Sequence, residues 1–234
     1  MAVGELKPQS DLAIRFTSAV VMIVVAGTAL WLGGWSWVLF VMAIALGVLW
    51  EWRTLAYAIT SAPGPRAAWM LGGMSYIGIA ALILLLLRHE LYGSRAIVLV
   101  PLIVVIATDI GAYFSGRLIG GPKIAPAISP SKTWAGLGGG MVAATLVLWL
   151  STQHLLQLNW SASLPELLIL GPLAAILAQT GDFFESWMKR RAGVKDSGHL
   201  IPGHGGLFDR VDGLIALLSV GGVLLMLIGW LGLN

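Results

Sequence analysis

The feature that most constrains this chain is a series of about seven apolar segments, each close to the length of a membrane-crossing helix. They lie near residues 14–33, 35–51, 67–87, 94–115, 135–152, 164–187 and 211–233. A helix needs about 20 residues to cross ~30 Å of hydrocarbon. Charged residues make up 11% of the 234 positions, against about 25% in an average soluble domain. The sequence therefore predicts an all-α, polytopic integral membrane protein that forms a single domain over residues 1–234.

The first two segments leave two arrangements open. They are divided only by Gly33 and Gly34, so they form either a tight hairpin or a partly re-entrant pair. Lys7 and Arg15 precede the apolar core of the first segment, as basic residues precede the core of a signal peptide, but no small-residue cleavage site follows. We therefore interpret this segment as a retained membrane anchor.

The positions of the basic residues predict the orientation. Loops that stay in the cytoplasm carry an excess of Lys and Arg. With the N-terminus inside, the opposite side of the membrane holds only Arg88 and Arg95. The remaining 12 of the 14 basic residues are then cytoplasmic: Lys7, Arg15, Arg53, Arg66, Arg117, Lys123, Lys132, Lys189, Arg190, Arg191, Lys195 and Arg210. We expect a protein of the inner (cytoplasmic) cell membrane, with the C-terminus outside and no nucleic-acid partner.

Polar side chains share one face at the end of the sixth segment. In "GDFFESWMKRR", Asp182, Glu185, Ser186 and Lys189 are spaced at i, i+3, i+4 and i+7, which places them on one stripe of a helix. Ionisable groups inside a membrane are rare and usually functional. The alternative is an ion pair of Lys189 with Asp182 or Glu185 that only locks helix packing.

The stretch that follows carries the groups of a phosphate site. Glycine allows backbone N–H groups to approach an anion closely, and Lys and Arg neutralise phosphate charge. Closely spaced carboxylates suit Mg²⁺, which prefers oxygen ligands together with phosphate. "KDSGHLIPGHGGLFDRVDG" holds both kinds of group: Lys195, Asp196, His199, His204, Asp209, Arg210 and Asp212. The pattern predicts a nucleotide site without a G-x-x-x-x-G-K-[ST] loop.

A second cluster follows the fourth segment. Asp109, Tyr113 and Arg117 are spaced at i, i+4 and i+8, and the next loop contains Lys123, Ser129, Lys132 and Thr133. Two polar stretches at the same membrane surface predict one cytoplasm-facing cleft. For Asp109, a structural hydrogen bond to a neighbouring helix explains the residue equally well.

These residues carry a resemblance to a known family. Ser186-x-x-Lys189-Arg190, Lys195-Asp196, Pro202-Gly203-His204-Gly205-Gly206 and Asp209-Arg210-x-Asp212 resemble the motif of the phosphatidate cytidylyltransferases, or CDP-diacylglycerol synthases. The "D..AY..GR..G" block at 109–120, "SPSKT" at 129–133 and "WEW" at 50–52 are similar to the family as well. Ser131 and Ala135 stand where members commonly have lysine and glutamate, so an active enzyme cannot depend on those two groups. Set against many members, we expect this sequence to lack one or more peripheral N-terminal helices.

The resemblance implies a reaction and a role for each residue. CTP and phosphatidic acid would give CDP-diacylglycerol and pyrophosphate, in phospholipid biosynthesis. By analogy Asp182 and Asp209 would ligate Mg²⁺, and a second cation is compatible with the site. Catalytic roles are implied for Asp182, Asp209, Lys189, Ser186 and His204, although a structural role suits a lone histidine as well. Substrate binding is implied for Arg190, Lys195, Asp196, Arg210, Asp212, Ser129, Lys132, Thr133, Arg117, Asp109 and Tyr113.

Two other readings of the residues stay open. One is a CTP-dependent polyprenol or phytol kinase, which would use a similar nucleotide site. The other is an ion-coupled transporter in which Asp109 and Asp182 bind ions near the bilayer midplane. The sequence also leaves the oligomeric state open, a homodimer included.

Overall fold

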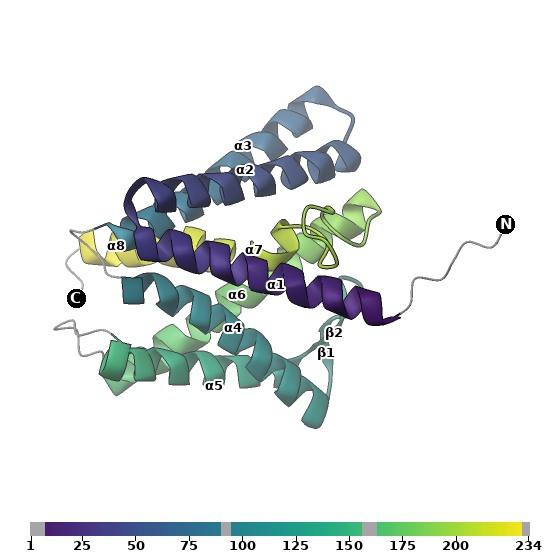
Figure 1. Ribbon diagram of the computed structural model, residues 1–234. Coiled ribbons are helices and arrows are strands. Elements are labelled where there is room, and N and C mark those ends of the chain that lie inside the picture. The colour runs from purple at the N-terminus through teal and green to yellow at the C-terminus, as the bar shows by residue number, and fades with distance from the viewer. Residues whose placement is uncertain (1–7, 90–94, 156–162, 231–234) are drawn as a thin grey trace.

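The computed structural model describes residues 8–89, 95–155 and 163–230, which form a bundle of long helices (Figure 1). The helices are α1 (Pro8–Leu32), α2 (Gly34–Ile59), α3 (Pro63–Arg88), α4 (Arg95–Leu118), α5 (Trp134–Leu150), α6 (Leu164–Ala192), α7 (Phe208–Ala216) and α8 (Val223–Trp230). A π-helical turn, η1 (Ser151–Leu155), continues α5, and a second, η2 (Leu217–Gly222), joins α7 to α8. Strands β1 (Lys123–Ala125) and β2 (Ser129–Thr133) pair antiparallel.

Seven helical spans in the described chain are long and apolar enough to cross a membrane. This confirms the prediction of a polytopic all-α membrane protein. The first two spans, α1 and α2, contain 25 and 26 residues, so each is long enough to cross by itself. Gly33 and Gly34 join them with φ angles of 65° and 51°, which glycine adopts without strain. Of the two arrangements left open by the sequence, the tight hairpin is therefore the one formed.

The helices run up and down, so the connections gather at two ends of the bundle. One end, on the right in Figure 1, holds the α2–α3 turn, the β1–β2 hairpin and the connection 193–207. The other end holds the α1–α2 turn, where Arg88 donates from Nε to the carbonyl oxygen of Leu30 at 3.3 Å and Arg95 stacks over Trp31 at 4.3 Å. Among the described residues, Arg88 and Arg95 are the only Lys or Arg residues at this end. We call the first end the basic end.

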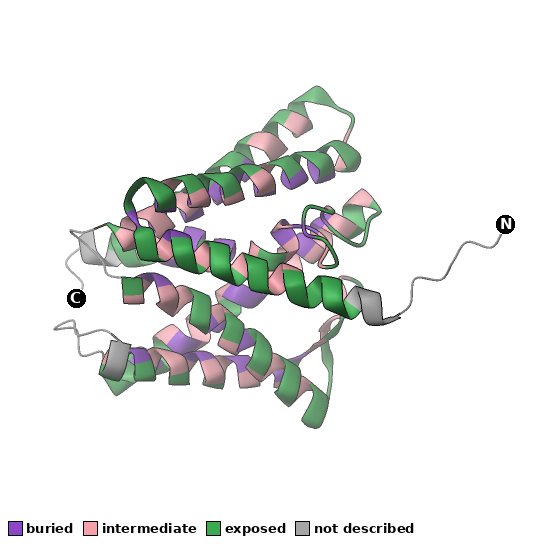
Figure 2. Cartoon of the chain, in the orientation of Figure 1, coloured by how far each residue is buried: buried purple, intermediate pink, exposed green. Residues whose placement is uncertain are grey.

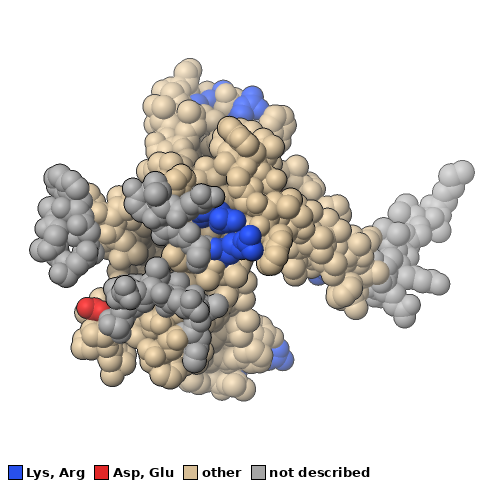
Figure 3. All heavy atoms as spheres, turned by 60° about the vertical axis from the view of Figure 1, so that its left-hand side comes forward, with Lys and Arg blue, Asp and Glu red and all other residues tan. Residues whose placement is uncertain are grey.

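The surface is consistent with a lipid environment. Large apolar side chains are exposed along most helices, and α1 is exposed over most of its length (Figure 2). The face seen in Figure 3 is largely uncharged, with small groups of Lys and Arg. Apolar groups on an outer surface of this size are favourable in hydrocarbon and costly in water.

Two interior contacts hold the bundle. A cluster of buried side chains joins α2, α3, α6 and α7 around Phe208, Met188 and Leu55. Helices α4 and α5 approach closely where Gly111 and Gly139 face each other, as small residues allow in membrane helix pairs. Helix α6 packs against both groups, so it lies between the two halves of the bundle.

Three elements at the basic end differ from the prediction. Helix α2 was predicted to end near residue 51 and continues to Ile59, and α6 was predicted to end near 187 and continues to Ala192. A fall in hydropathy marks where a chain leaves hydrocarbon, and a helix can continue into the interface. The 123–133 segment, predicted as a loop, forms the β1–β2 hairpin.

Candidate active site

The connection between α6 and α7 folds back over the basic end of the bundle. Helix α6 ends at Ala192, and Gly193, with a φ of 73°, forms its left-handed C-cap. Gly203 and Gly205 also have positive φ angles, and Ile201 pairs with Gly205 in a short bridge. Helix α7 then begins at Phe208, so Asp209 lies in its first turn.

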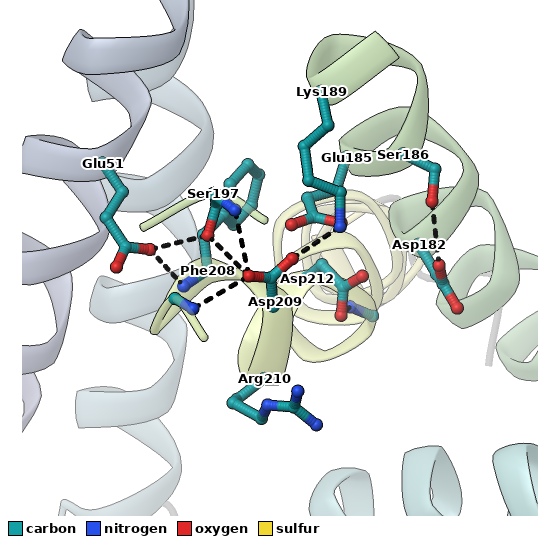
Figure 4. Close-up of polar contacts among 12 residues, drawn as sticks. Glu51, Asp182, Glu185, Ser186, Lys189, Ser197, Phe208, Asp209, Arg210 and Asp212 are labelled. Carbon is teal, nitrogen blue, oxygen red and sulfur yellow. Dashed lines mark hydrogen bonds and ion pairs between the residues drawn. The ribbon is translucent and has the colours of Figure 1, made fainter. Parts of the chain in front are cut away.

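The carboxylate of Asp209 is saturated with hydrogen bonds. Its Oδ1 accepts from Lys189 Nζ at 2.5 Å. Its Oδ2 accepts from the backbone nitrogen of Ser197 at 3.0 Å, from Ser197 Oγ at 3.1 Å and from the backbone nitrogen of Gly206 at 2.9 Å. Figure 4 shows these contacts converging on Asp209 from the connection and from α6. Asp209 therefore ties the 193–207 connection to α6.

A second carboxylate, Glu51 of α2, anchors the same connection from the other side. It is 2% exposed. Its oxygens accept from Ser197 Oγ at 2.9 Å and from the backbone nitrogens of Leu207 and Phe208 at 2.9 and 2.8 Å. The two backbone groups are free N–H donors at the start of α7, so Glu51 acts as a helix cap supplied from a distant part of the chain. Gly198 and Gly206 leave it room, because a Cβ at either would come within 3.0 Å of its side chain.

Three further carboxylates lie close together beside this anchor. One oxygen from each of Asp182, Glu185 and Asp212 lies within 4.8 Å of the other two. Figure 4 places Asp212 between Asp209 and Asp182. Lys132 pairs with Asp182 at 2.5 Å and Lys189 pairs with Glu185 at 2.6 Å.

Two observations indicate that these carboxylates are suited to bind a divalent cation. Together with Asp209 they place four carboxyl groups beside the two ammonium groups of Lys132 and Lys189, so the carboxyl groups outnumber the cations that pair with them. The Oε1 atom of Glu185 is buried and makes no hydrogen bond to any described residue, although a buried oxygen normally has a partner. Carboxylate oxygens are the ligands that Mg²⁺ prefers.

A basic cavity of about 460 Å³ adjoins the carboxylates. Arg117 from α4, Lys123 from β1 and Lys132 from β2 bring three cationic side chains to it. The β1–β2 hairpin is what carries the two lysines there. The polar lining comes from four elements: Asp109, Tyr113, Arg117, Lys123, Ser131, Lys132, Thr133, Gln179 and Asp182.

The start of α5 is turned toward this cavity. Thr133 Oγ1 accepts from the backbone nitrogen of Gly136 at 3.0 Å, so Thr133 is the N-cap of α5. Both residues line the cavity. A helix N-terminus carries partial positive charge, which adds to the field of the three cations. A cavity with this charge is suited to an anion such as a phosphate chain.

Comparison with known proteins gives the family. The sequence profile of the cytidylyltransferase family matches residues 60–228, a range that contains the carboxylates of α6 and α7 and the whole basic cavity. The chain belongs to the cytidylyltransferase family.

Relatives within this family are similar over nearly their full length. The chain is 35% identical to the phosphatidate cytidylyltransferase of Brucella melitensis over 250 residues, which cover 88% of this chain and 90% of the relative. It is 34% identical to the protein of the same name from Rickettsia bellii, over 89% of this chain and 88% of that one. For Rickettsia prowazekii the identity is 31%.

The structure of this cytidylyltransferase brings most of the expected site residues together. Six of them line the basic cavity: Asp109, Tyr113, Arg117, Lys132, Thr133 and Asp182. Four more lie in or beside the group of carboxylates: Ser186, Lys189, Asp209 and Asp212. Ser186 Oγ lies 3.4 Å from Asp182 Oδ1. The expected i, i+4 contact on α4 is also present, because Arg117 donates to the Tyr113 hydroxyl at 2.7 Å.

Other expected site residues lie outside these contacts. Arg190, Lys195 and Asp196 are exposed, and Ser129 begins β2 opposite Ala125, away from the residues that line the basic cavity. Arg210 donates to the carbonyl oxygen of His204 at 2.7 and 3.2 Å and points away from the carboxylates in Figure 4. The Nδ1 atom of His204 is buried and has no hydrogen-bond partner among the described residues.

Sequence reasoning missed two groups of this cytidylyltransferase. Glu51 was noted only as part of the "WEW" motif and was not proposed as a site residue, although a carboxylate inside an apolar segment itself indicates a functional residue. Glu185 was considered as an ion-pair partner of Lys189, and the structure adds its proximity to Asp182 and Asp212. The proposed metal residue Asp209 lies outside that group of three, so its role as a ligand stays a prediction.

Proposed function

We propose that the protein transfers the cytidylyl group of CTP to phosphatidic acid, giving CDP-diacylglycerol and pyrophosphate. One observation carries the proposal: a basic cavity meets a cluster of carboxylates at one end of a membrane-embedded bundle. The cavity suits a triphosphate, and its position beside lipid suits a second substrate that stays in the membrane. The relatives named for this activity support the same reaction.

The bond changes follow from the two substrates. An oxygen of the phosphatidate phosphate attacks the α-phosphorus of CTP, the bond from that phosphorus to the bridging oxygen breaks, and pyrophosphate leaves with the electron pair. Such transfers depend mainly on positioning and on neutralising charge. We assign Arg117, Lys123 and Lys132 to the triphosphate, because all three line the basic cavity.

The residues around Lys189 would supply a fixed positive charge. Lys189 is held between Glu185 and Asp209, so its ammonium group has little freedom to move. A charge held in advance of the reaction stabilises developing negative charge without reorganisation. We propose that Lys189 faces the phosphates and that Asp209 and Glu51 position the turn that holds it.

We propose that the cofactor is Mg²⁺, held by Asp182, Glu185 and Asp212. When bound, it would neutralise phosphate charge and hold the phosphates in place. A ligand role for Asp209, which the family resemblance implies, is the alternative to this assignment, and the response of Asp209→Asn to added Mg²⁺ tests it. A second cation remains a prediction. A homodimer also remains one, and light scattering of the purified protein in detergent would measure it.

We further propose that the basic end faces the cytoplasm of a cell whose inner membrane holds the protein. The clustering of Lys and Arg at this end supports it, as does the need for CTP, which is made in the cytoplasm. In this orientation the N-terminus lies inside.

The decisive test follows the phosphorus atoms of CTP. Purified protein is mixed with Mg²⁺, with CTP labelled on either the α- or the γ-phosphate, and with phosphatidic acid or, in parallel reactions, a polyprenol or phytol. Label from the α-position should enter lipid, and label from the γ-position should leave as pyrophosphate. A polyprenol or phytol kinase would place the γ-label in lipid, and a transporter would place neither. Neither alternative is favoured by the family match.

A further inference from the structure

A second cavity, of about 610 Å³, lies on the other side of α6. On α6 the basic cavity uses Gln179 and Asp182, whereas this cavity uses Leu177, Thr180, Gly181 and Phe184. Positions 177, 180, 181 and 184 form one helical stripe, and 179 and 182 lie on the opposite face. Helix α6, which carries Asp182 and Glu185, therefore lies between two cavities of different chemistry.

The walls of the second cavity are apolar and aromatic. We call it the apolar groove. Trp52, Trp69, Tyr76 and Phe184 line it, and the ring centroids of Trp52 lie 5.8–6.1 Å from those of the other three. Trp52 Nε1 donates to the carbonyl oxygen of Trp69 at 2.9 Å, which fixes the indole. These contacts give the groove a set shape.

The groove borders the backbone that carries the carboxylates. A Cβ on Gly181 would come within 3.0 Å of the Asp212 carbonyl oxygen, so the groove wall touches the backbone of the cluster. Gly181 and Phe184 are the sequence neighbours of Asp182 and Glu185. A ligand in the groove would place its polar end beside these carboxylates.

The size and depth of the groove suit a hydrocarbon chain. On α3 the lining runs from Pro65 at the basic end to Tyr76, which is about 16 Å along a helix. Both ends of this stretch lie within a membrane-crossing span. Gly72 widens the groove at its middle, because no atom lies within 4 Å of the position its Cβ would occupy.

We infer that the apolar groove holds one acyl chain of the phospholipid substrate. The inference rests on the proposed function, and it deepens that function by assigning separate places to the two substrates. The nucleotide enters from the basic cavity, and the lipid lies along the opposite face of α6. Their phosphates meet at Asp182 and Asp212, with the acyl chain setting where the lipid phosphate lies.

A substitution at Gly72 tests the groove, with a matched control on the same helix. Gly72→Leu projects into the groove, and Gly78→Leu projects into equally open space outside it. Gly72→Leu should lower kcat/KM for dioleoyl phosphatidate by about tenfold or more, since misplacing a reacting group can cost on the order of 100-fold. The KM for CTP should not change, and Gly78→Leu should behave as wild type. Equal effects of the two variants would overturn the inference.

A direct measurement covers a variant that fails to fold. Phosphatidate with a photoreactive group in one acyl chain is irradiated with wild-type protein, and the labelled peptides are mapped. We expect label on the groove residues of α3 and α6 in excess over the exposed face around Gly78. Even labelling of both faces would show ordinary lipid contact and end the inference. If the wild-type protein makes no CDP-diacylglycerol, the proposed function fails, while the labelling still decides what occupies the groove.

Discussion

At the scale of single residues, Asp209 and Asp212 lie one turn apart on α7 and are expected to do different work. Both carboxylate oxygens of Asp209 accept hydrogen bonds, from Lys189 and from the 193–207 connection, whereas Asp212 accepts from the backbone nitrogen of Gly213 and faces two other carboxylates. Asp209→Asn should lower turnover at least about 100-fold through misplacement of Lys189 and the connection. Raising Mg²⁺ should not restore it.

The matched variant is Asp212→Asn, measured across a range of Mg²⁺ concentration. Removing one of three carboxylates should weaken the metal site, so added Mg²⁺ should recover part of its activity. Membrane insertion of both proteins is checked by yield in detergent. Recovery of Asp209→Asn activity by added Mg²⁺ would place Asp209 among the metal ligands. Wild-type turnover in that variant would remove Asp209 from the site.

Lys189 allows a packing role to be separated from a catalytic one. Lys189→Met leaves Glu185 and Asp209 without their shared cation, and removing one partner of a buried pair costs about 3–5 kcal/mol. Glu185→Gln combined with Lys189→Met removes part of that penalty, so thermal stability should recover. Turnover should stay below that of Glu185→Gln alone, which lacks only the proposed metal ligand, because the charge for phosphate is still missing. Substantial turnover in the double variant would show that Lys189 has only a packing role.

Glu51 is expected to act through the turn it holds. Glu51→Gln keeps the shape but places an amide N–H₂ among donors, and an unsatisfied buried group costs about 1–3 kcal/mol. We expect lower thermal stability together with loss of turnover, since α7 and Asp209 lose their anchor. Glu166→Gln is the control, because Glu166 also caps a helix by accepting from the backbone nitrogen of Ser163 at 2.8 Å but is exposed. Equal effects on turnover would argue against a positioning role for Glu51.

At the scale of elements, the sequence predicted each membrane span but not where the helices end. Apolar length reports the hydrocarbon layer, whereas α2 continues to Ile59 by packing its polar end against neighbours. Arg53 stacks on the ring of Tyr57 from within α2 at 4.7 Å, and Arg66 of α3 stacks on the same ring at 4.5 Å across the α2–α3 turn. Such contacts are invisible to a hydropathy pattern. The β1–β2 hairpin was missed because Pro126 and Pro130 interrupt its sequence, and proline argues against a strand.

At the scale of the whole molecule, the sequence showed which residues carry chemistry but not which of them meet. The motif of 186–212 is continuous in the chain, yet its members Arg190, Lys195 and Asp196 are exposed, whereas Asp209 is held by hydrogen bonds inside the turn. Glu51 joins the same site from about 150 positions away. Local spacing predicts neighbours on one helix, and long-range pairing depends on how α2, α6 and α7 pack.

The sidedness of the whole bundle can be measured with one matched pair of substitutions. The chain has no cysteine, so each introduced thiol is the sole target. Ser36 and Ser61 are both exposed and lie at opposite ends of α2. Ser61→Cys, at the basic end, should react with an impermeant thiol reagent from the cytoplasmic face, and Ser36→Cys from the opposite face.

Lys195→Cys then reports on the connection itself. Ser197 is unsuitable, because it is 3% exposed and bonded to Glu51 and Asp209, whereas Lys195 is exposed. Lys195→Cys, like Ser61→Cys, should be labelled from the cytoplasmic face, because the connection and the α2–α3 turn share one end of the bundle (Figure 1). If both were labelled from outside, the bundle would have the opposite orientation, and the basic cavity would be inaccessible to cytoplasmic CTP. Labelling of the two from different faces would contradict the fold.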